Sequence, residues 1–324
     1  MSLRPTISRG ISVIVPTIGR PDSLRRMLDS LCRQTHAVHE VIVADGSSTC
    51  ETSTVVSDTC WERAGLKVER VAVHPPNAVR QRQAAIGLAG GEYLLLLDDD
   101  VVLETDCAAQ MVKLLGQDTA TVAVFGDFNN QSWPMPTRAW RFYLRYMLRM
   151  PEGTWQGQVV GPLLRFGYNP RPLQPMPMEW LGTCNSMIRR LAYEKVGGFS
   201  DFFLHRCTMN EDVDLGIKLS RVGRIVFCPS ARLGHFHAPG GRVAPMQVAE
   251  DDLYNRYLVM RRTQQRSARS AFGLVLVYFT VETGSNLGGC LRRRKGNGLW
   301  ARTCGRLRAM VRILALPIMQ KVNA

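Results

Sequence analysis

The segment YLLLLDDDVVLE, residues 93–104, places four leucines directly before three aspartates. Leucine side chains favour burial, whereas carboxylates need water, a cation or a hydrogen-bonding partner. The segment therefore predicts a buried strand that ends at a polar site. If the chain stays extended, Asp98 and Asp100 point to one side and Asp99 points to the other. Two carboxylates on one side suit a hard divalent cation such as Mg²⁺, and the alternative is a solvated acidic loop.

Strand and helix patterns alternate along the first hundred residues. Short apolar runs at 11–17, 40–45 and 66–73 predict strands, and the stretches 20–35, 52–65 and 77–91 between them predict helices. This alternation is typical of an α/β protein with a mostly parallel, Rossmann-like sheet and helices on both faces. Ligands of such sheets bind beyond the carboxyl ends of the strands, where Asp45 and residues 98–100 fall.

The second half of the chain is less regular. Prolines and aromatic residues are frequent from 129 to 177, and a helix is predicted there only over 137–150. A helix at 211–223 begins with Glu211 and Asp212, where the helix macrodipole keeps acids ionised. An ionised carboxylate that faces a cleft can act as a general base, although simple N-terminal capping also explains the pair. His235 and His237 share one face of a strand and are either metal ligands or ordinary polar residues.

Composition narrows the class of protein. The 324 residues are 45% hydrophobic and 21% charged, which is typical of a globular protein. No apolar run is long enough for an ordinary membrane-spanning helix, and the N-terminus lacks the features of a secretory signal. Nine scattered cysteines without a CxxC pair favour a reducing cytoplasm. Phosphate loops of the GxxxxGK[ST] and GxGxxG types are absent, which argues against ATP hydrolysis and dinucleotide redox chemistry.

The net charge of +14 is concentrated at the C-terminal end. Residues 261–324 hold thirteen Lys or Arg and one acid, a net of +12, while the first 260 residues carry about +2. Within 299–319, Leu, Met, Val and Trp alternate with arginines, as in an interfacial helix. We therefore expect a basic, amphipathic helical extension that binds an anionic membrane surface. Nucleic-acid binding is the alternative, and the high apolar content of the extension disfavours it.

Taken together and in this order, several segments make the chain similar to the family 2 glycosyltransferases, which have the glycosyltransferase A-type fold. The resemblance covers roughly residues 11–237. The segments that carry it are 11–35, 40–48, 80–100, 182–203, 210–229 and 231–237. The QxxRW motif of processive polysaccharide synthases is absent, so the resemblance implies the addition of a single sugar.

The resemblance implies a binding site for a nucleotide sugar. In it, Pro16 and Thr17 would lie against the nucleotide base and Asp45 would read that base. The family often has two acids at this place, and the first is Ala44 here. The residues implied in binding the nucleotide sugar are Pro16, Thr17, Asp45, Arg82, Asp98 and Asp99.

The resemblance also implies a metal site and a catalytic base. Asp98 and Asp100 match the DxD motif, which holds Mg²⁺ or Mn²⁺ together with the donor phosphates, and His235 matches a histidine that completes the metal shell in some relatives. Asp212 matches the catalytic base, with Glu211 beside it. The chemistry is consistent, because departure of a nucleoside diphosphate needs a Lewis acid and an acceptor hydroxyl needs a base.

From these observations the sequence predicts an inverting, metal-dependent hexosyl- or glycosyltransferase of polysaccharide synthesis. Residues 1–240 would form the catalytic domain and 241–324 the membrane-associating extension. The expected partners are a nucleotide-sugar donor, a saccharide or lipid-linked saccharide acceptor, and the inner face of the cell membrane, where the cytoplasmic enzyme would be peripheral. Transfer to a polyprenyl phosphate, or a non-catalytic protein that binds sugar nucleotides or nucleic acid, are the alternatives.

Overall fold

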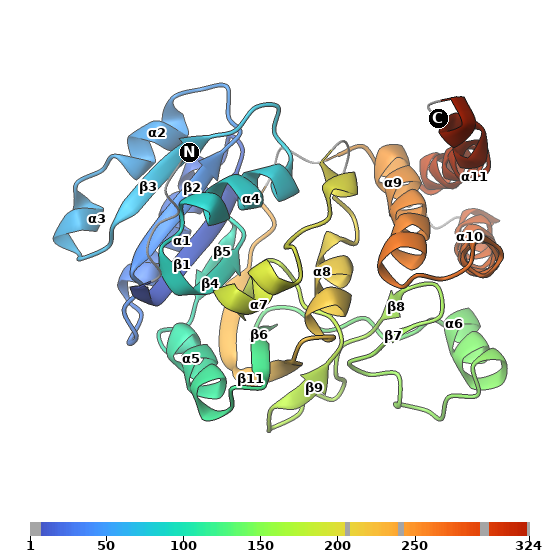
Figure 1. The fold of residues 1–324 in the computed structure, drawn as a ribbon, viewed down its shortest axis with the longest axis horizontal. Coiled ribbons are helices and arrows are strands. Elements are labelled where there is room, and N and C mark those ends of the chain that lie inside the picture. Colours follow the sequence, from blue (N-terminus) through green and yellow to red (C-terminus); the bar gives the residue numbers. More distant parts are fainter. Residues whose placement is uncertain (1–7, 205–207, 239–242, 292–297, 323–324) are drawn as a thin grey trace.

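The computed structural model describes residues 8–204, 208–238, 243–291 and 298–322, and within them nine strands form one sheet (Figure 1). A short hairpin of two further strands, β7 (Val159–Val160) and β8 (Leu164–Arg165), lies apart from it. The strands of the sheet are β1 (Ser8–Thr17), β2 (Glu40–Asp45), β3 (Val68–Ala72), β4 (Gly91–Leu97), β5 (Val101–Leu103), β6 (Thr121–Phe128), β9 (Met176–Met178), β10 (Asn185–Arg189) and β11 (Arg224–His235).

Helices connect the strands and make up the C-terminal part. They are α1 (Pro21–Cys32), α2 (Glu51–Val56), α3 (Cys60–Arg63), α4 (Ala78–Leu88), α5 (Cys107–Gln117), α6 (Arg138–Phe142), α7 (Arg190–Lys195), α8 (Glu211–Leu219), α9 (Pro245–Leu258), α10 (Ala268–Leu291) and α11 (Leu299–Val322). Single turns of π-helix extend α6 over Tyr143–Met147 and α9 over Val259–Thr263.

The order of strands places the polar site at one edge of the sheet. The order is β3-β2-β1-β4-β10-β6-β11-β5, with β9 paired to β11. Strands β1 to β4 run parallel to one another, and β10 runs antiparallel between β4 and β6. The four leucines 94–97 of β4 are completely buried, as their sequence predicts. Because β1 and β4 are parallel neighbours, Thr17 and Asp98 end at the same edge.

The local helix signals were correct except at one place. Asn77 caps α4 as predicted, since its side chain accepts a hydrogen bond from the Arg80 amide at 3.0 Å. The single helix expected over 52–65 is instead two short helices, α2 and α3. The side chain of Asp58 accepts a hydrogen bond from the Cys60 amide at 3.0 Å, and this local bond competes with continuation of the helix.

The three C-terminal helices gather at the end of the molecule away from β3 (Figure 1). Helix α11 packs closely on α9, because Gly305 lies against the Met246 carbonyl, where a Cβ atom would overlap the backbone. Arg306 of α11 is buried and forms an ion pair with Glu282 of α10 at 3.3 Å. Arginines of the basic extension therefore also join its helices to one another.

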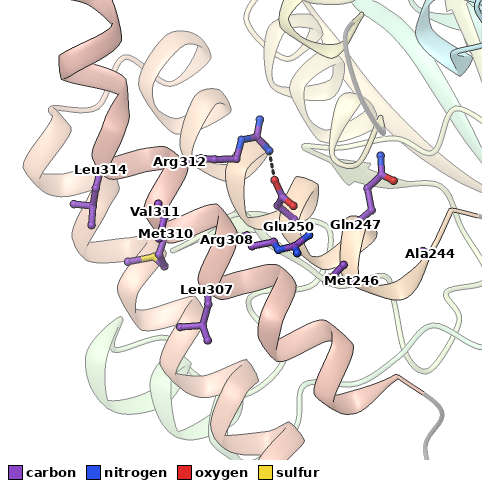
Figure 2. Close-up of a pocket in the computed structure, with 10 residues that line it drawn as sticks. All are labelled: Ala244, Met246, Gln247, Glu250, Leu307, Arg308, Met310, Val311, Arg312 and Leu314. Atoms are coloured by element: carbon purple, nitrogen blue, oxygen red, sulfur yellow. Dashed lines mark hydrogen bonds and ion pairs between the residues drawn. The ribbon is translucent and has the colours of Figure 1, made fainter.

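The outer side of α11 is apolar and exposed. Trp300, Leu307, Val311 and Leu314 are each at least half exposed, and they recur at helical spacing. Figure 2 shows Arg312 of α11 turned toward Glu250 of α9. The two side chains form an ion pair with a distance of 2.9 Å from Nη1 to Oε1. A shallow groove of about 1030 Å³ runs along this side between α9 and α11. No helix among the described residues is both long enough and apolar enough to cross a membrane.

Candidate active site

The loops that follow β1 and β4 are joined by hydrogen bonds to Asp99. The Thr17 hydroxyl donates to Asp99 Oδ2 at 2.6 Å, and Arg20 Nη1 donates to Asp99 Oδ1 at 3.1 Å. Burial raises the pKa of Asp99 to about 6, although both of these contacts favour the ionised form. Asp99 thus fixes the shape of the site, and both of its oxygens are engaged by the protein.

Arg82 connects the first aspartate of the motif to the start of α8. Its Nη2 lies 2.7 Å from Asp98 Oδ1, and its Nη1 lies 3.7 Å from Glu211 Oε1. Burial and the neighbouring Asp212 raise the pKa of Glu211 to about 8, and Arg82 opposes this shift. At neutral pH Glu211 is therefore mainly protonated, while Arg82 neutralises Asp98.

Asp100 meets the two histidines because β5 pairs with the end of β11. His235 Nε2 lies 3.0 Å from Asp100 Oδ1, and the Ala238 amide donates to Asp100 Oδ2 at 2.9 Å. Burial alone would raise the pKa of Asp100, but His235 and the Ala238 amide hold it at about 2. Within the described residues, ligand atoms of Asp100, His235 and His237 lie within 4.8 Å of one another.

This trio fits a divalent metal ion by its chemistry. It offers one carboxylate oxygen and two imidazole nitrogens, a mixed set that suits Mn²⁺ better than the all-oxygen preference of Mg²⁺. The family resemblance implies Asp100 and His235 as ligands, whereas for His237 the sequence left a metal ligand and an ordinary polar residue as alternatives. Asp98 was also predicted as a ligand, but its carboxylate lies against Arg82 and outside the trio.

Asp212 lies at the start of α8 and is paired with an arginine that the sequence analysis missed. Arg165 Nη2 lies 3.2 Å from Asp212 Oδ2, and Arg165 Nη1 donates to Asn210 Oδ1 at 3.0 Å. Arg165 comes from the short hairpin β7–β8, 47 residues before Asp212. An isolated arginine in an irregular, proline-rich stretch carries no sequence signal that points to this contact.

Asp45 ends β2, and both of its carboxylate oxygens are engaged within the protein. The Ser47 amide donates to Oδ1 at 2.8 Å, and Arg70 Nε donates to Oδ2 at 2.8 Å. The side chain is completely buried and is not part of the cavity lining described below. Recognition of the nucleotide base by Asp45 stays a prediction.

Two cavities adjoin at Asp212. The first, which we call the polar cavity, has a volume of about 320 Å³ and is lined by predicted donor-binding residues at the ends of β1 and β4 and on α4. The second, the aromatic cavity, has a volume of about 460 Å³ and extends toward α10. The two share Gly182, Cys184 and Asp212 in their lining. The predicted residues that line the polar cavity are Pro16, Thr17, Arg82, Asp98, Asp99, Glu211 and Asp212.

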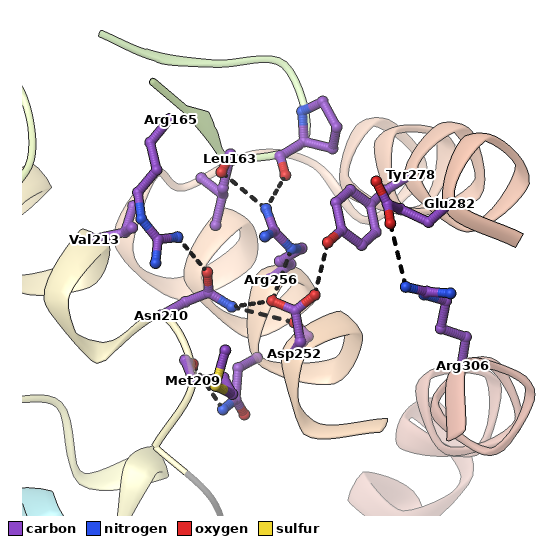
Figure 3. A network of polar contacts seen from close by, with 12 residues as sticks. Leu163, Arg165, Met209, Asn210, Val213, Asp252, Arg256, Tyr278, Glu282 and Arg306 are labelled. Atoms are coloured by element: carbon purple, nitrogen blue, oxygen red, sulfur yellow. Dashed lines mark hydrogen bonds and ion pairs between the residues drawn. The ribbon is translucent and has the colours of Figure 1, made fainter. Parts of the chain in front are cut away.

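A buried polar network ties the start of α8 to the C-terminal helices (Figure 3). Asn210, which has a left-handed backbone with φ of 71°, donates to Asp252 Oδ1 of α9 at 2.8 Å. Asp252 also accepts from Arg256 at 3.1 Å and from the Tyr278 hydroxyl of α10 at 2.8 Å. Arg256 in turn donates to the carbonyls of Pro162 and Leu163, beside the hairpin that carries Arg165.

The fold resembles solved glycosyltransferase structures. A structure of S. aureus TarS residues 1–349 matches 93% of this chain and 80% of its own, with 17% identity and a TM-score of 0.54. A structure of GalNAc-T7 with UDP, GalNAc and Mn²⁺ matches 78% of this chain and 48% of its own, with 16% identity and a TM-score of 0.59. These likenesses confirm the predicted glycosyltransferase A-type fold.

Curated relatives match over part of their length. The O-antigen biosynthesis protein RfbC of Myxococcus xanthus is 29% identical over 272 residues, which are 78% of this chain and 19% of RfbC. A PGL/p-HBAD biosynthesis glycosyltransferase of Mycobacterium tuberculosis is 30% identical over 120 residues, 36% of this chain and 45% of that protein. The chain thus spans less than half of either relative. The model of the family described as "Glycosyl transferase family 2" matches residues 12–197, more than half of the chain, and the chain therefore belongs to glycosyl transferase family 2.

Proposed function

We propose that this glycosyltransferase moves one sugar from a nucleoside diphosphate sugar to a hydroxyl group of a saccharide acceptor, with inversion at the anomeric carbon. The observation that carries the proposal is the shared position of Asp212 between the polar and aromatic cavities. A donor on one side and an acceptor on the other would meet at this carboxylate. TarS structures containing UDP and UDP-GlcNAc support a nucleotide-sugar donor.

The residues of the chain divide the reaction between them. The oxygen of the acceptor hydroxyl bonds to the anomeric carbon while Asp212 accepts the proton of that hydroxyl. At the same time, the bond from the anomeric carbon to the diphosphate oxygen breaks. Of the two acids at the start of α8, only Asp212 lines both cavities, which favours it over Glu211 as the base. Arg82 and the ends of β1 and β4 orient the donor.

Asp100, His235 and His237 would hold a divalent metal ion, for which we propose Mn²⁺ over Mg²⁺. When bound, the ion supplies Lewis-acid stabilisation of the departing diphosphate. Asp98 then contributes through Arg82, which it holds at 2.7 Å beside the polar cavity.

We also propose that the enzyme acts in the synthesis of a cell-envelope saccharide as a peripheral protein on the cytoplasmic face of the membrane. The similarity to RfbC supports the saccharide pathway. The exposed apolar side of α11 and the net positive charge beyond residue 261 support contact with anionic lipid. Arg308 is exposed beside this apolar side, whereas Arg306 and Arg312 are paired with acids.

The direct test is a screen for nucleoside diphosphate release with purified protein, Mn²⁺ and a panel of UDP-, GDP- and dTDP-sugars. One donor class should be hydrolysed slowly without acceptor and faster with a saccharide acceptor. Release that is equal for wild type and Asp212→Asn would contradict the proposal. Loss of the α-anomer of the donor with formation of a β-glycoside, followed by proton NMR, tests inversion.

A further inference from the structure

The aromatic cavity has one wall of interlocked rings. The ring centroids of Trp133 and Trp180 lie 5.4 Å apart in an edge-to-face arrangement, and each ring also packs against Phe125. Phe128 completes the cluster, 5.7 Å from Trp133. Such edge-to-face packing restrains each ring, so the buried rings hold the partly exposed Trp133 in a fixed position beside the cavity.

Trp133 owes its position to a glycine. A Cβ atom at residue 167 would overlap the indole ring of Trp133, so the ring lies directly on the Gly167 backbone. Trp133 is half-buried, with the remaining part of its ring open to the cavity that it lines. The indole N–H of Trp180 is buried and has no hydrogen-bond acceptor among the described residues.

The opposite wall is supplied by the C-terminal extension. Trp140 stacks on Tyr278 of α10 with centroids 5.7 Å apart, and its indole N–H donates to Glu282 at 2.9 Å. Arg306 of α11 holds the other oxygen of Glu282 at 3.3 Å. The extension therefore closes the cavity on the side away from the sheet.

Charges in the lining are compensated within the protein. Arg165 is paired with Asp212, Arg256 with Asp252, and Glu282 with Arg306. A phosphate group needs cationic donors that are free to form charge-assisted hydrogen bonds, and these two lining arginines already have carboxylate partners. A ring with apolar C–H faces and hydroxyl groups at its edge matches flat aromatic surfaces with few polar groups.

We propose that the aromatic cavity binds the uncharged terminal sugar ring of the acceptor, stacked on the exposed part of Trp133, with α10 as its second wall. The inference rests on the proposed function for its orientation toward Asp212. It makes the C-terminal extension part of the acceptor site, and it favours a saccharide hydroxyl over a polyprenyl phosphate as the group that is glycosylated.

The test measures binding without turnover. Saturation-transfer NMR is recorded on the 324-residue chain with UDP and Mn²⁺ present. Methyl glycosides of common hexoses and N-acetylhexosamines form one probe set, and geranyl phosphate is the other probe. At least one glycoside should bind saturably, and Trp133→Ala should weaken it by about 10-fold or more, as is usual for a central aromatic contact. Trp133→Phe keeps a ring and should stay within about 3-fold of wild type.

Two further variants keep the result interpretable. Gly167→Ala displaces the Trp133 ring without removing it and should also weaken the glycoside. Trp300→Phe, on the exposed side of α11 and outside the cavity, should leave binding unchanged. Thermal unfolding of each variant identifies any loss of glycoside binding that comes from loss of fold.

The inference would be overturned if geranyl phosphate binds and Trp133→Ala weakens its binding, while no glycoside binds in this way. Glycoside binding that is indifferent to Trp133→Ala and Gly167→Ala would overturn it as well. If no donor in the panel is turned over while a glycoside still binds through Trp133, the proposed function fails and the saccharide site stands. If transfer occurs, Trp133→Ala should raise the acceptor KM and leave the donor KM unchanged.

Discussion

The polar and aromatic cavities, which share Asp212, are lined by different kinds of side chain: mainly charged and polar ones in the first and mainly aromatic ones in the second. The polar cavity is made at the ends of regular strands, and its carboxylates are held by Thr17, Arg20 and Arg82. The aromatic cavity combines the end of β6 with irregular segments and with residues of α6, α9 and α10, and its polar groups are mostly paired with one another. Regular strands place charged groups with little freedom, while loops and an added helix can vary the shape of a pocket.

This difference separates two kinds of effect. Changes in the polar cavity should alter the reaction with every acceptor, because each acceptor meets the same donor and base. Substitutions in the aromatic cavity should change turnover to a different extent with each acceptor. Substitutions in each cavity can separate effects on all acceptors from effects on one acceptor, and the first of these is at Asp212, which both cavities share.

Replacing the shared carboxylate should have the largest effect. Asp212→Asn keeps the size of the side chain and removes its basicity, so turnover should fall by about 10²- to 10⁴-fold, the usual range for loss of a general base. UDP affinity, measured by calorimetry, should stay within a few-fold of wild type. The exposed Asp22 on α1 provides the matched control, and Asp22→Asn should retain full turnover.

Near-normal turnover of Asp212→Asn would show that another residue is the catalytic base. Asp214 is a poor substitute, because it is completely buried and accepts a hydrogen bond from Ser200 at 2.7 Å. Glu211 would then be the remaining acid of the shared wall.

Removal of the metal ligand should affect the polar cavity alone. Asp100→Ala should weaken binding of UDP in the presence of Mn²⁺ by about 10- to 100-fold, which is the scale of losing a metal-orienting group. In excess chelator, wild type and variant should bind UDP equally weakly. Equal affinities with Mn²⁺ present would exclude Asp100 from donor binding, and glycoside binding in the aromatic cavity should not change in either case.

Ionisation of Glu211 should make stability fall as the pH rises. Its pKa of about 8 lies above the ordinary value of 4.5, so the folded state binds this proton more tightly than the unfolded state does. The resulting stabilisation is complete below the ordinary pKa and is lost as pH rises through about 8. Between pH 6 and pH 8 the free energy of unfolding should drop by about 2 kcal/mol from this group alone.

The comparison of Glu211→Gln with wild type isolates this contribution. The amide stays neutral, so the drop between pH 6 and pH 8 in chemical denaturation experiments should be smaller for the variant than for wild type by about 2 kcal/mol. Glu62→Gln, at an exposed position of α3, should follow the wild-type trend. Parallel curves for wild type and Glu211→Gln would show that Glu211 is already ionised at pH 6.

The smallest effect should lie on the outer side of α11, far from both cavities. Leu307→Gln should reduce partitioning onto vesicles that contain anionic lipid by about 5-fold, because part of one leucine side chain no longer enters the interface. Leu173→Gln, at a position that is 93% exposed outside α11, is the control. If the fraction of protein bound to vesicles changes neither with Leu307→Gln nor with the anionic lipid content, the proposed membrane contact is contradicted.

Sequence reasoning succeeded where one local pattern determines the structure. The leucines of β4 and the acids at the start of α8 carry their own periodicity and capping signals. The parallel pairing of β1 with β4 then places Thr17 close to the aspartates that follow β4. It failed for Arg165, whose role depends on a contact across 47 residues from a two-stranded hairpin. The lining of the aromatic cavity was missed for the same reason, because Trp133, Trp180 and Tyr278 are far apart in the sequence and come together only in the folded chain.

The charge pattern of the extension was read correctly as amphipathic, but its arginines serve two purposes. Arg306 and Arg312 neutralise acids of α10 and α9, which no count of net charge can reveal. Of the residues between them, Leu307 and Val311 are exposed, whereas Ala309 is buried. A pattern that suits a lipid surface also suits a helix that packs on acidic neighbours.

The contribution of α10 to the aromatic cavity has a consequence for the order of synthesis. The polar cavity can be completed once Asp212 has been added, but Tyr278 and Glu282 follow 66 and 70 residues later. At ordinary rates of translation this interval is roughly 4 to 14 s. During it, Trp140 lacks both its stacking partner and its hydrogen-bond acceptor. A chain shortened near residue 240 would keep that unfinished wall permanently and would also lack Asp252, the hydrogen-bond acceptor of Asn210, even though every catalytic carboxylate is present.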